Sequence, residues 1–196
     1  MTFVVDGTNG LTFNDATTQS STATNASNIS SGTLGKARLP TGSVLQVAQA
    51  TLLGTQAVSG ASAWADVTSL SVSITPTSSS SKILVSFVVN CDGEANLYFR
   101  MMRGATAIGV GNADGSRQQV SAGNGAINGN TSGTIMMTNQ FLDSPATTSA
   151  TTYKVQAYAD NSTSTGTYYI NYASGDGNNA HSSRCMSSIT VMEISA

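Results

Sequence analysis

From residue 44 onward the chain repeats short runs in which apolar and polar residues alternate, and this alternation limits the possible folds more than any other feature. In DVTSLSVSIT, residues 66–75, Leu70, Val72 and Ile74 alternate with serine and threonine. Successive side chains of a β-strand point to opposite faces, so this run has one apolar face and one hydroxyl-bearing face. It predicts a strand with one face buried and the other in water.

The run KILVSFVVNCD, residues 82–92, is more apolar than its neighbours. Leu84 and Val88 make one of its faces partly apolar, which predicts a central strand covered on both sides. The other face of this run is formed by Ile83, Val85, Phe87, Val89 and Cys91. We expect Ile189 and Val191 of the last strand to cover that face.

Further short runs of the same kind follow: NLYFRMMR, TIMMTNQFL, TTYKVQAYA, TYYINYA and SSITVMEIS. No window over residues 45–196 keeps a helical period, and serine, threonine, asparagine and glycine are poor residues for a helix interior. We therefore predict an all-β head over residues 44–196, an antiparallel β-sandwich or jelly roll of about eight strands. For residues 104–133 we expect a surface loop that contains one strand, around residues 107–110.

Residues 1–43 form a polar segment with few charges and one short apolar element. FVVDGTNGLTF has β-rich ends around Asp-Gly and Asn-Gly turn signals, which predicts a hairpin within residues 1–24. Residues 25–43 carry large apolar side chains only at Ile29, Leu34 and Leu39. This spacing does not fit the alternating three- and four-residue steps of a coiled coil, and the composition also fits a disordered linker.

Charge and composition exclude several classes of partner. Only 9% of residues are charged, against roughly 25% in a typical soluble domain, and the net charge is -2. The arginines are scattered, so nucleic acid is not an expected partner. No basic segment followed by an apolar one begins the chain, and no stretch is long enough to insert into a membrane, so we expect synthesis as a cytosolic product. Cys91 and Cys185 are expected to be free thiols.

The sequence contains little that suggests catalysis. His181 is the only histidine, so one chain cannot form a multi-histidine metal site, and we expect this histidine in an exposed loop. Asp114, Asp143, Asp160 and Asp176 stand in turn contexts. A carboxylate pair for glycoside hydrolysis depends on the fold and stays open here. There is no Gly-x-Ser-x-Gly motif, so we predict no enzymatic activity, no cofactor and no metal.

Several segments, taken in order, resemble one class of protein. GLTFNDATTQSSTA and NISSGTLGKARLPTGSVLQV resemble a recurrent module of bacteriophage tail-fibre and related virion appendage proteins, especially those of marine phages and cyanophages. AWADVTSLSVSITPTSSSSKILVSFVV, LDSPATTSATTYKVQAYA and SSITVMEIS resemble the C-terminal head domain of such fibres. The resemblance covers nearly the whole chain apart from residues 104–133, and it includes no catalytic motif.

The resemblance implies a homotrimer located in the virion. Residues 1–24 would then be a docking hairpin for other virion proteins of the tail, baseplate or capsid. Residues 25–43 would be an extended trimeric shaft, because three chains side by side can gather Ile29, Leu34 and Leu39 around one axis and pair their backbones.

Host attachment through surface glycans is the function that this resemblance favours. The stretch TYYINYASGDGNNAHSSR is the richest candidate, because aromatic rings stack on sugar faces while amides and carboxylates pair with hydroxyls. Alternatively, its tyrosines face the core and the loop only connects two strands. Two other functions stay open: a structural capsid decoration, head-fibre or baseplate protein without a receptor, and, more distantly, a polysaccharide depolymerase. The candidate receptor contacts are Tyr168, Tyr169, Asn171, Tyr172, Asp176, Asn178, Asn179, His181 and Arg184.

Overall fold

The structure is a computed structural model that describes residues 4–6, 10–12, 18–19, 35–59, 62–93, 96–124, 133–160, 167–180 and 182–196. The chain divides into two compact units, Met1–Leu39 and Pro40–Ala196. In the first unit, β1 (Val4–Asp6) and β2 (Gly10–Thr12) pair antiparallel, as the turn signals predict, and β3 (Thr18–Gln19) pairs with β2.

The segment predicted to be extended contains one helical turn. Residues Lys36–Arg38 form the 3₁₀ helix η2, in which the Arg38 amide donates to the Gly35 carbonyl over 2.9 Å. The expectation of an extended backbone over 25–43 is wrong for these three residues, because i→i+3 hydrogen bonds close the turn before Pro40. Leu39 is half-buried, and Ile29 and Leu34 lie outside the described residues.

The first sheet of the head is built around the longest strand, β7 (Lys82–Gly93). The strand β11 (Ile135–Asp143) pairs along one edge of β7. The strands β14 (Ser187–Ile194) and β13 (Thr167–Ile170) follow each other along the opposite edge. Outside them lie β4 (Val44–Leu52), which pairs with β14, and β5 (Gln56–Ser59), which pairs with β13.

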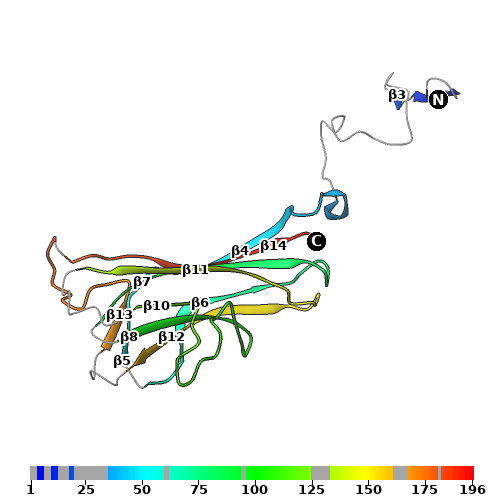
Figure 1. The fold of residues 1–196 in the computed structure, drawn as a ribbon. Coiled ribbons are helices and arrows are strands. Elements are labelled where there is room, and N and C mark those ends of the chain that lie inside the picture. The colour runs from blue at the N-terminus through cyan, green and yellow to red at the C-terminus, as the bar shows by residue number, and fades with distance from the viewer. Residues whose placement is uncertain are drawn as a thin grey trace. The chain divides into compact units, whose positions relative to one another are not determined.

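The second sheet lies opposite the first (Figure 1). Its order is β6 (Ala65–Ile74), β12 (Thr151–Asp160) and β8 (Asn96–Arg103). Two short strands, β9 (Thr106–Ile108) and β10 (Ala122–Asn124), pair with successive parts of β8. Every strand pair in the described part of the chain is antiparallel, which confirms the predicted all-β, antiparallel class.

The core fills the space between the two sheets. The predicted inward face of β7, from Ile83 to Cys91, is buried, and its Phe87 ring lies 6.4 Å from the Phe99 ring of the other sheet, between centroids. Ile189 and Val191 are also buried, but they pair beside Phe87 and Val85 in the same sheet. The prediction that they cover this face is wrong: they flank it, and residues of the second sheet cover it.

The opposite side of β7 is not covered by the described part of the chain. Leu84 and Val88 point away from the core and are half-exposed. The prediction that β7 is buried on both sides is therefore wrong for the residues that the structure describes.

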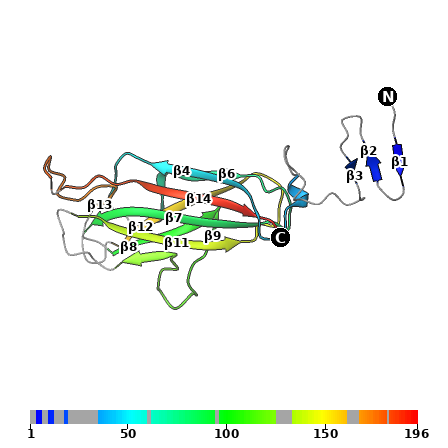
Figure 2. The same cartoon turned by 90° about the horizontal axis from the view of Figure 1, so that it is seen from above.

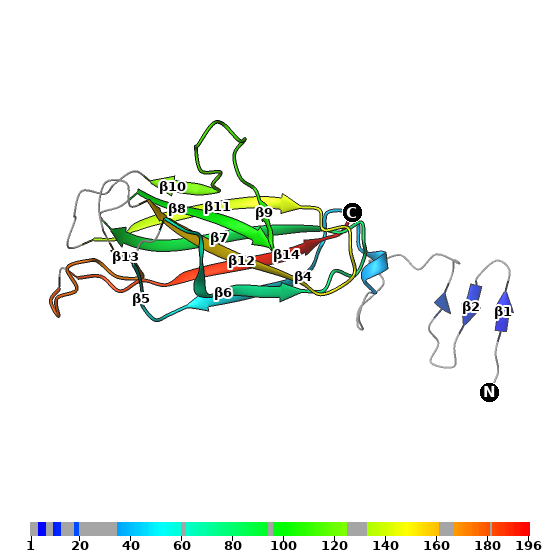
Figure 3. The same ribbon diagram turned by 90° about the horizontal axis from the view of Figure 1, so that it is seen from below.

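The head has two distinct ends, seen in Figure 2 and Figure 3. At the Lys82 end of β7, the Gly42 amide donates to the Ser195 carbonyl over 2.8 Å, and the Ser195 hydroxyl donates to the Pro40 carbonyl over 2.8 Å. The chain thus enters the head and ends at this proximal end, and the head begins at Pro40. At the Gly93 end, residues 171–180 and 182–186 leave the sheet between β13 and β14. We call these the distal end and the distal loop.

Candidate functional site

The distal loop starts from a paired base. Tyr172 and Arg184 form an antiparallel bridge, and the Cys185 amide donates to the Asn171 carbonyl over 2.9 Å. The two arms of the loop are therefore held together where they leave the sheet (Figure 2).

Asn171 fixes this base to the neighbouring strand. Its backbone has a φ of +69°, a left-handed conformation that asparagine tolerates better than most residues. The side-chain amide is buried and donates to the carbonyls of Leu52 over 2.7 Å and Gly54 over 2.8 Å. Its carbonyl oxygen accepts a 2.6 Å hydrogen bond from the Ser187 hydroxyl. The amide is thus used for structure and is not available to a ligand.

Asp92 is the second anchor of the loop. This buried carboxylate accepts a 2.7 Å hydrogen bond from the Ser174 amide and a 2.8 Å hydrogen bond from the Gly93 amide. Ala173, which stands between Asn171 and Ser174, is also buried. A loop held in this way presents its tip in a defined position, which lowers the entropic cost of binding.

The tip of the distal loop encloses a surface hollow of about 330 Å³. The Arg184 guanidinium lies 2.5 Å from an Asp176 carboxylate oxygen and 5.5 Å above the Tyr172 ring. Tyr169 meets the Tyr172 ring edge to face at 5.0 Å. Partial burial, aided by Tyr169 and Asp176, raises the pKa of Tyr172, so its phenol stays protonated and can donate. The hollow is lined by Asp176, Gly177, Asn178, Asn179, Ser182 and Arg184.

The structure separates the predicted receptor contacts into three groups. Tyr168 and Asn171 are 1% and 0% exposed, so their prediction as receptor contacts is corrected: Tyr168 points into the core, and Asn171 anchors the loop. His181 lies outside the described residues. The others come together in or beside the hollow: Tyr169, Tyr172, Asp176, Asn178, Asn179 and Arg184.

A second aromatic surface was missed by the sequence analysis. Tyr158 pairs with Tyr98 across β12 and β8, and their rings lie 6.1 Å apart. Trp64, just before β6, lies 5.3 Å from Tyr158, and the Arg100 guanidinium lies 4.1 Å above the Trp64 ring. We call Trp64, Tyr158 and Tyr98 the aromatic row. Tyr98 and Tyr158 alternate with buried residues along their strands, which places them outward. This signal does not show that the two strands and Trp64 come together.

Paired polar groups continue this outer face of the second sheet. Arg100 donates twice to the Gln156 side-chain carbonyl, over 2.9 and 2.7 Å. The amide of Gln156 donates to Asp66 over 2.7 Å, and Lys154 forms a 2.8 Å ion pair with the same carboxylate. This face thus carries charged groups that are paired with one another.

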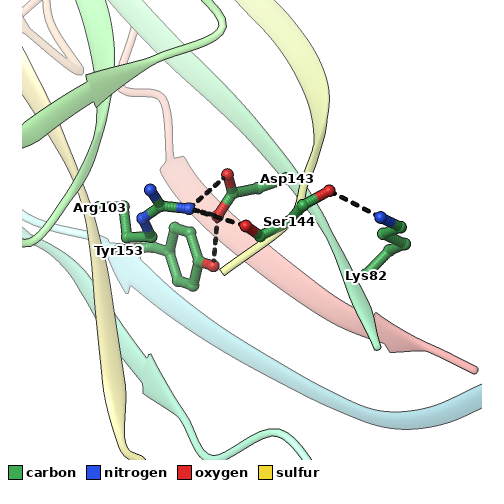
Figure 4. Close-up of polar contacts among 5 residues, drawn as sticks. All are labelled: Lys82, Arg103, Asp143, Ser144 and Tyr153. Atoms are coloured by element: carbon green, nitrogen blue, oxygen red, sulfur yellow. Dashed lines mark hydrogen bonds and ion pairs between the residues drawn. The ribbon is translucent and has the colours of Figure 1, made fainter. Parts of the chain in front are cut away.

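A polar cluster at the proximal end has a structural role (Figure 4). One nitrogen of Arg103 lies 2.8 and 2.9 Å from the two carboxylate oxygens of Asp143, and the Tyr153 hydroxyl donates to Asp143 over 2.8 Å. Tyr153 is fully buried, and this burial together with the carboxylate raises the pKa of Tyr153. Beside them, Lys82 donates to the Ser144 hydroxyl over 2.9 Å. The cluster closes the core with its donors matched to acceptors.

Asp143→Asn tests this structural role. The amide keeps one acceptor but loses the charge opposite Arg103, so we expect the free energy of unfolding to fall by about 1–3 kcal/mol. Denaturant unfolding of the purified protein measures the change. Asp114→Asn is the matched control, because its ion pair with Arg117 is exposed and should contribute at most about 1 kcal/mol. Equal losses in the two variants would refute the structural role.

Other candidate chemistries find little support in the described part of the chain. Within it, no three histidine, cysteine or acidic side chains gather closely enough to hold a metal ion. None of its helices has the length and apolar character needed to cross a membrane. Cys91 and Cys185 are free thiols, and burial, with Asp92 nearby, raises the pKa of Cys91 to about 12, far from that of a reactive thiolate.

Comparisons with known proteins give no family for this chain. No family model matches it, and no curated protein is detectably similar to it in sequence.

Proposed function

We propose that this chain is a bacteriophage virion appendage, a tail-fibre protein whose head attaches to glycans on the host surface through the distal loop. The observation that carries the proposal is the position of the anchored polar hollow, with Tyr172 beside it, at the end opposite to the one where the chain enters the head. A head mounted by its proximal end points this hollow outward. The sequence resemblance supports the same class.

The topology of the head supports a jelly roll. Three pairs of strands each continue one another along a neighbouring strand, and each pair is counted here as one long strand: β4 with β5, β9 with β10, and β13 with β14. Numbered along the chain, the head then has eight long strands. Their order is 1-8-3-6 in the first sheet and 2-7-4-5 in the second. Each connection between consecutive long strands then passes from one sheet to the other, except that between the fourth and the fifth. This wrapping pattern is that of a jelly roll.

The proposal includes an assembly and a location. The native species is a homotrimer, and the hairpin of residues 1–24 docks to other virion proteins. The shaft runs from residue 25 to Leu39, after which the head begins, with Ile29, Leu34 and Leu39 near the axis. The protein is made in the host cytoplasm and acts in the virion, without catalysis, cofactor or metal.

The hollow is suited to a sugar. A pyranose places its apolar face on an aromatic ring, and its hydroxyls both donate and accept. Beside the hollow, Tyr169 and Tyr172 provide aromatic rings, and Tyr172 also provides a protonated phenol. Within the hollow, Asp176 provides acceptors, and the Asn178 and Asn179 side chains provide both kinds of group. Such a site is weak alone, but three linked copies raise the avidity about a hundredfold or more.

Replacement of Tyr172 and Asn179 together by alanine tests the proposed attachment. Loss of a ring and an amide, each worth about 1 kcal/mol, should weaken adsorption to host cells by about tenfold or more. EDTA should not change it. The binding of the labelled full chain to cells measures adsorption, and native mass spectrometry should show an unchanged assembly.

Trp64→Ala is the control at the aromatic row, and we expect it to leave adsorption unchanged. Loss of adsorption in this control alone would move the attachment site to the aromatic row. Absence of adsorption by the wild-type chain, with normal incorporation into particles that needs residues 1–24, would instead show a structural virion protein. New reducing ends on host polysaccharide would show a depolymerase. Loss of adsorption with EDTA, restored by metal, would contradict the metal-free site.

A further inference from the structure

The outer face of the first sheet carries large apolar side chains that are exposed. Val47 is 57% exposed, Leu142 is 52% exposed and Met136 is 63% exposed. All three are outward positions on β4 or β11, on the side of the sheet that faces away from the core. We call the outward apolar positions of β4, β14, β7 and β11 the apolar face: Val44, Val47, Met192, Ile194, Leu84, Val88, Leu142 and Met136.

The strand register places the outward positions in rows that cross the sheet. One row across all four strands is entirely apolar, and the next row toward the distal end is uncharged and polar. In that second row Gln49 donates to the Thr190 hydroxyl over 2.8 Å. The apolar row is Val47, Met192, Leu84 and Leu142, and the polar row is Gln49, Thr190, Ser86 and Gln140.

The two outer faces of the head differ sharply in charge. Among the outward, solvent-facing positions of β4, β14, β7 and β11, only Lys82 is charged, and it lies at the proximal rim, bonded to Ser144. The outer face of the second sheet carries the paired groups Arg100, Asp66 and Lys154. The second sheet thus has the surface expected in water, and the first sheet has that expected in an interface.

The size of the outer face of these four strands, with its apolar and polar rows together, suits a stable contact. Four strands spaced about 4.8 Å apart, with nine residues of about 3.3 Å in β11, give a surface of roughly 20 by 30 Å. Its projected area of roughly 600 Å² approaches the roughly 800 Å² that each partner buries in a standard interface.

We propose that the apolar face is the surface through which identical copies of the head pack in the homo-oligomer. Two copies of an uncharged face can pack against each other, fully or in part, without repulsion between like charges. The polar row contains amides and hydroxyls, which both donate and accept, so equivalent groups of another copy can pair with it. Packing of this kind covers the second side of β7, which the sequence predicts to be covered and which the described residues of one chain leave open. The inference rests on the homo-oligomeric part of the proposed function.

The full-length variant Val47→Glu with Leu142→Glu tests this interface. Each glutamate is tolerated in water at an exposed strand position but is not tolerated in an apolar contact. Light scattering and native mass spectrometry over a dilution series should show that the concentration at half-dissociation rises at least tenfold. Thr68→Glu with Ser71→Glu adds the same charges at exposed positions of the opposite outer face, and assembly should be unchanged.

A labelling experiment covers the case in which the double variant does not fold. Met136→Cys places a thiol on the apolar face, and maleimide should label it at least tenfold more slowly in the assembly than after dilution to monomer. The wild-type chain gives the background from Cys91 and Cys185. Equal labelling rates, or a glutamate variant that assembles like the control, would overturn this interface alone. A wild-type chain that is monomeric at micromolar concentration would overturn the homo-oligomer as well, whereas attachment is judged separately by adsorption.

Discussion

Phe87→Ala is expected to lower the free energy of unfolding of the head by roughly 3–5 kcal/mol. Phe87 is 1% exposed, stands in the middle of the longest strand and packs toward the Phe99 ring of the opposite sheet. Its truncation removes buried apolar area and leaves a cavity that two sheets fixed by their ladders cannot readily close. Denaturant unfolding followed by fluorescence measures the loss.

Phe141→Ala is the matched control for this experiment. Phe141 lies on the neighbouring strand β11, opposite Val85, but is 38% exposed. Because less of its ring leaves water on folding, we expect a distinctly smaller loss. If Phe87→Ala costs no more than Phe141→Ala, the described core is incorrect.

Acid should destabilise the head through Glu193. This buried carboxylate accepts 2.7 Å hydrogen bonds from the amide and the hydroxyl of Thr77, and a 2.6 Å hydrogen bond from the Gln46 side chain. Burial alone would raise the pKa of Glu193, but these donors outweigh it and lower the pKa to about 2, from an ordinary value of 4.5. The pKa is lower in the folded state, so the stabilisation is complete above about pH 4.5 and is lost as the pH falls toward 2.

Glu193→Gln should remove this pH dependence. The lowered pKa of Glu193 corresponds to about 3 kcal/mol of stabilisation near neutral pH. In the variant, the glutamine side-chain NH2 also faces hydrogen-bond donors of Thr77 or Gln46, and two donors cannot bond to each other. We expect a loss of about 2–3 kcal/mol at pH 7 and a difference from the wild-type protein that shrinks toward pH 2. Free energies of unfolding across pH 2–7 measure both effects, with Asp114→Asn as an exposed control. A wild-type and variant difference that stays constant over this range would contradict the assignment.

The alternation of residues predicted the strands of the head because burial on one face is a local property. The runs around Leu70 and Phe87 form strands with the predicted inward faces. Which strands lie side by side depends on pairing between distant segments. For this reason Ile189 was expected to cover Phe87, whereas the register places it beside Phe87 in the same sheet.

The candidate site was predictable in its location but not in its individual contacts. The density of tyrosine, asparagine and glycine indicated the distal loop, and Tyr172 lies beside its hollow. Tyr168 and Asn171 were wrongly predicted to be receptor contacts. Tyr168 is at an inward-facing position of its strand, and Asn171, with its positive φ, directs its side chain into the base of the loop. The aromatic row and the apolar face were missed because each exists only through the register of several strands.

Electron microscopy of the intact particle, with an antibody against the head marking this chain, tests the central claim most directly. An appendage that attaches to the host by its distal loop places the label at the outer tip of the tail or of its fibres. A label spread over the capsid shell, or confined to the inside of the baseplate, would contradict host attachment.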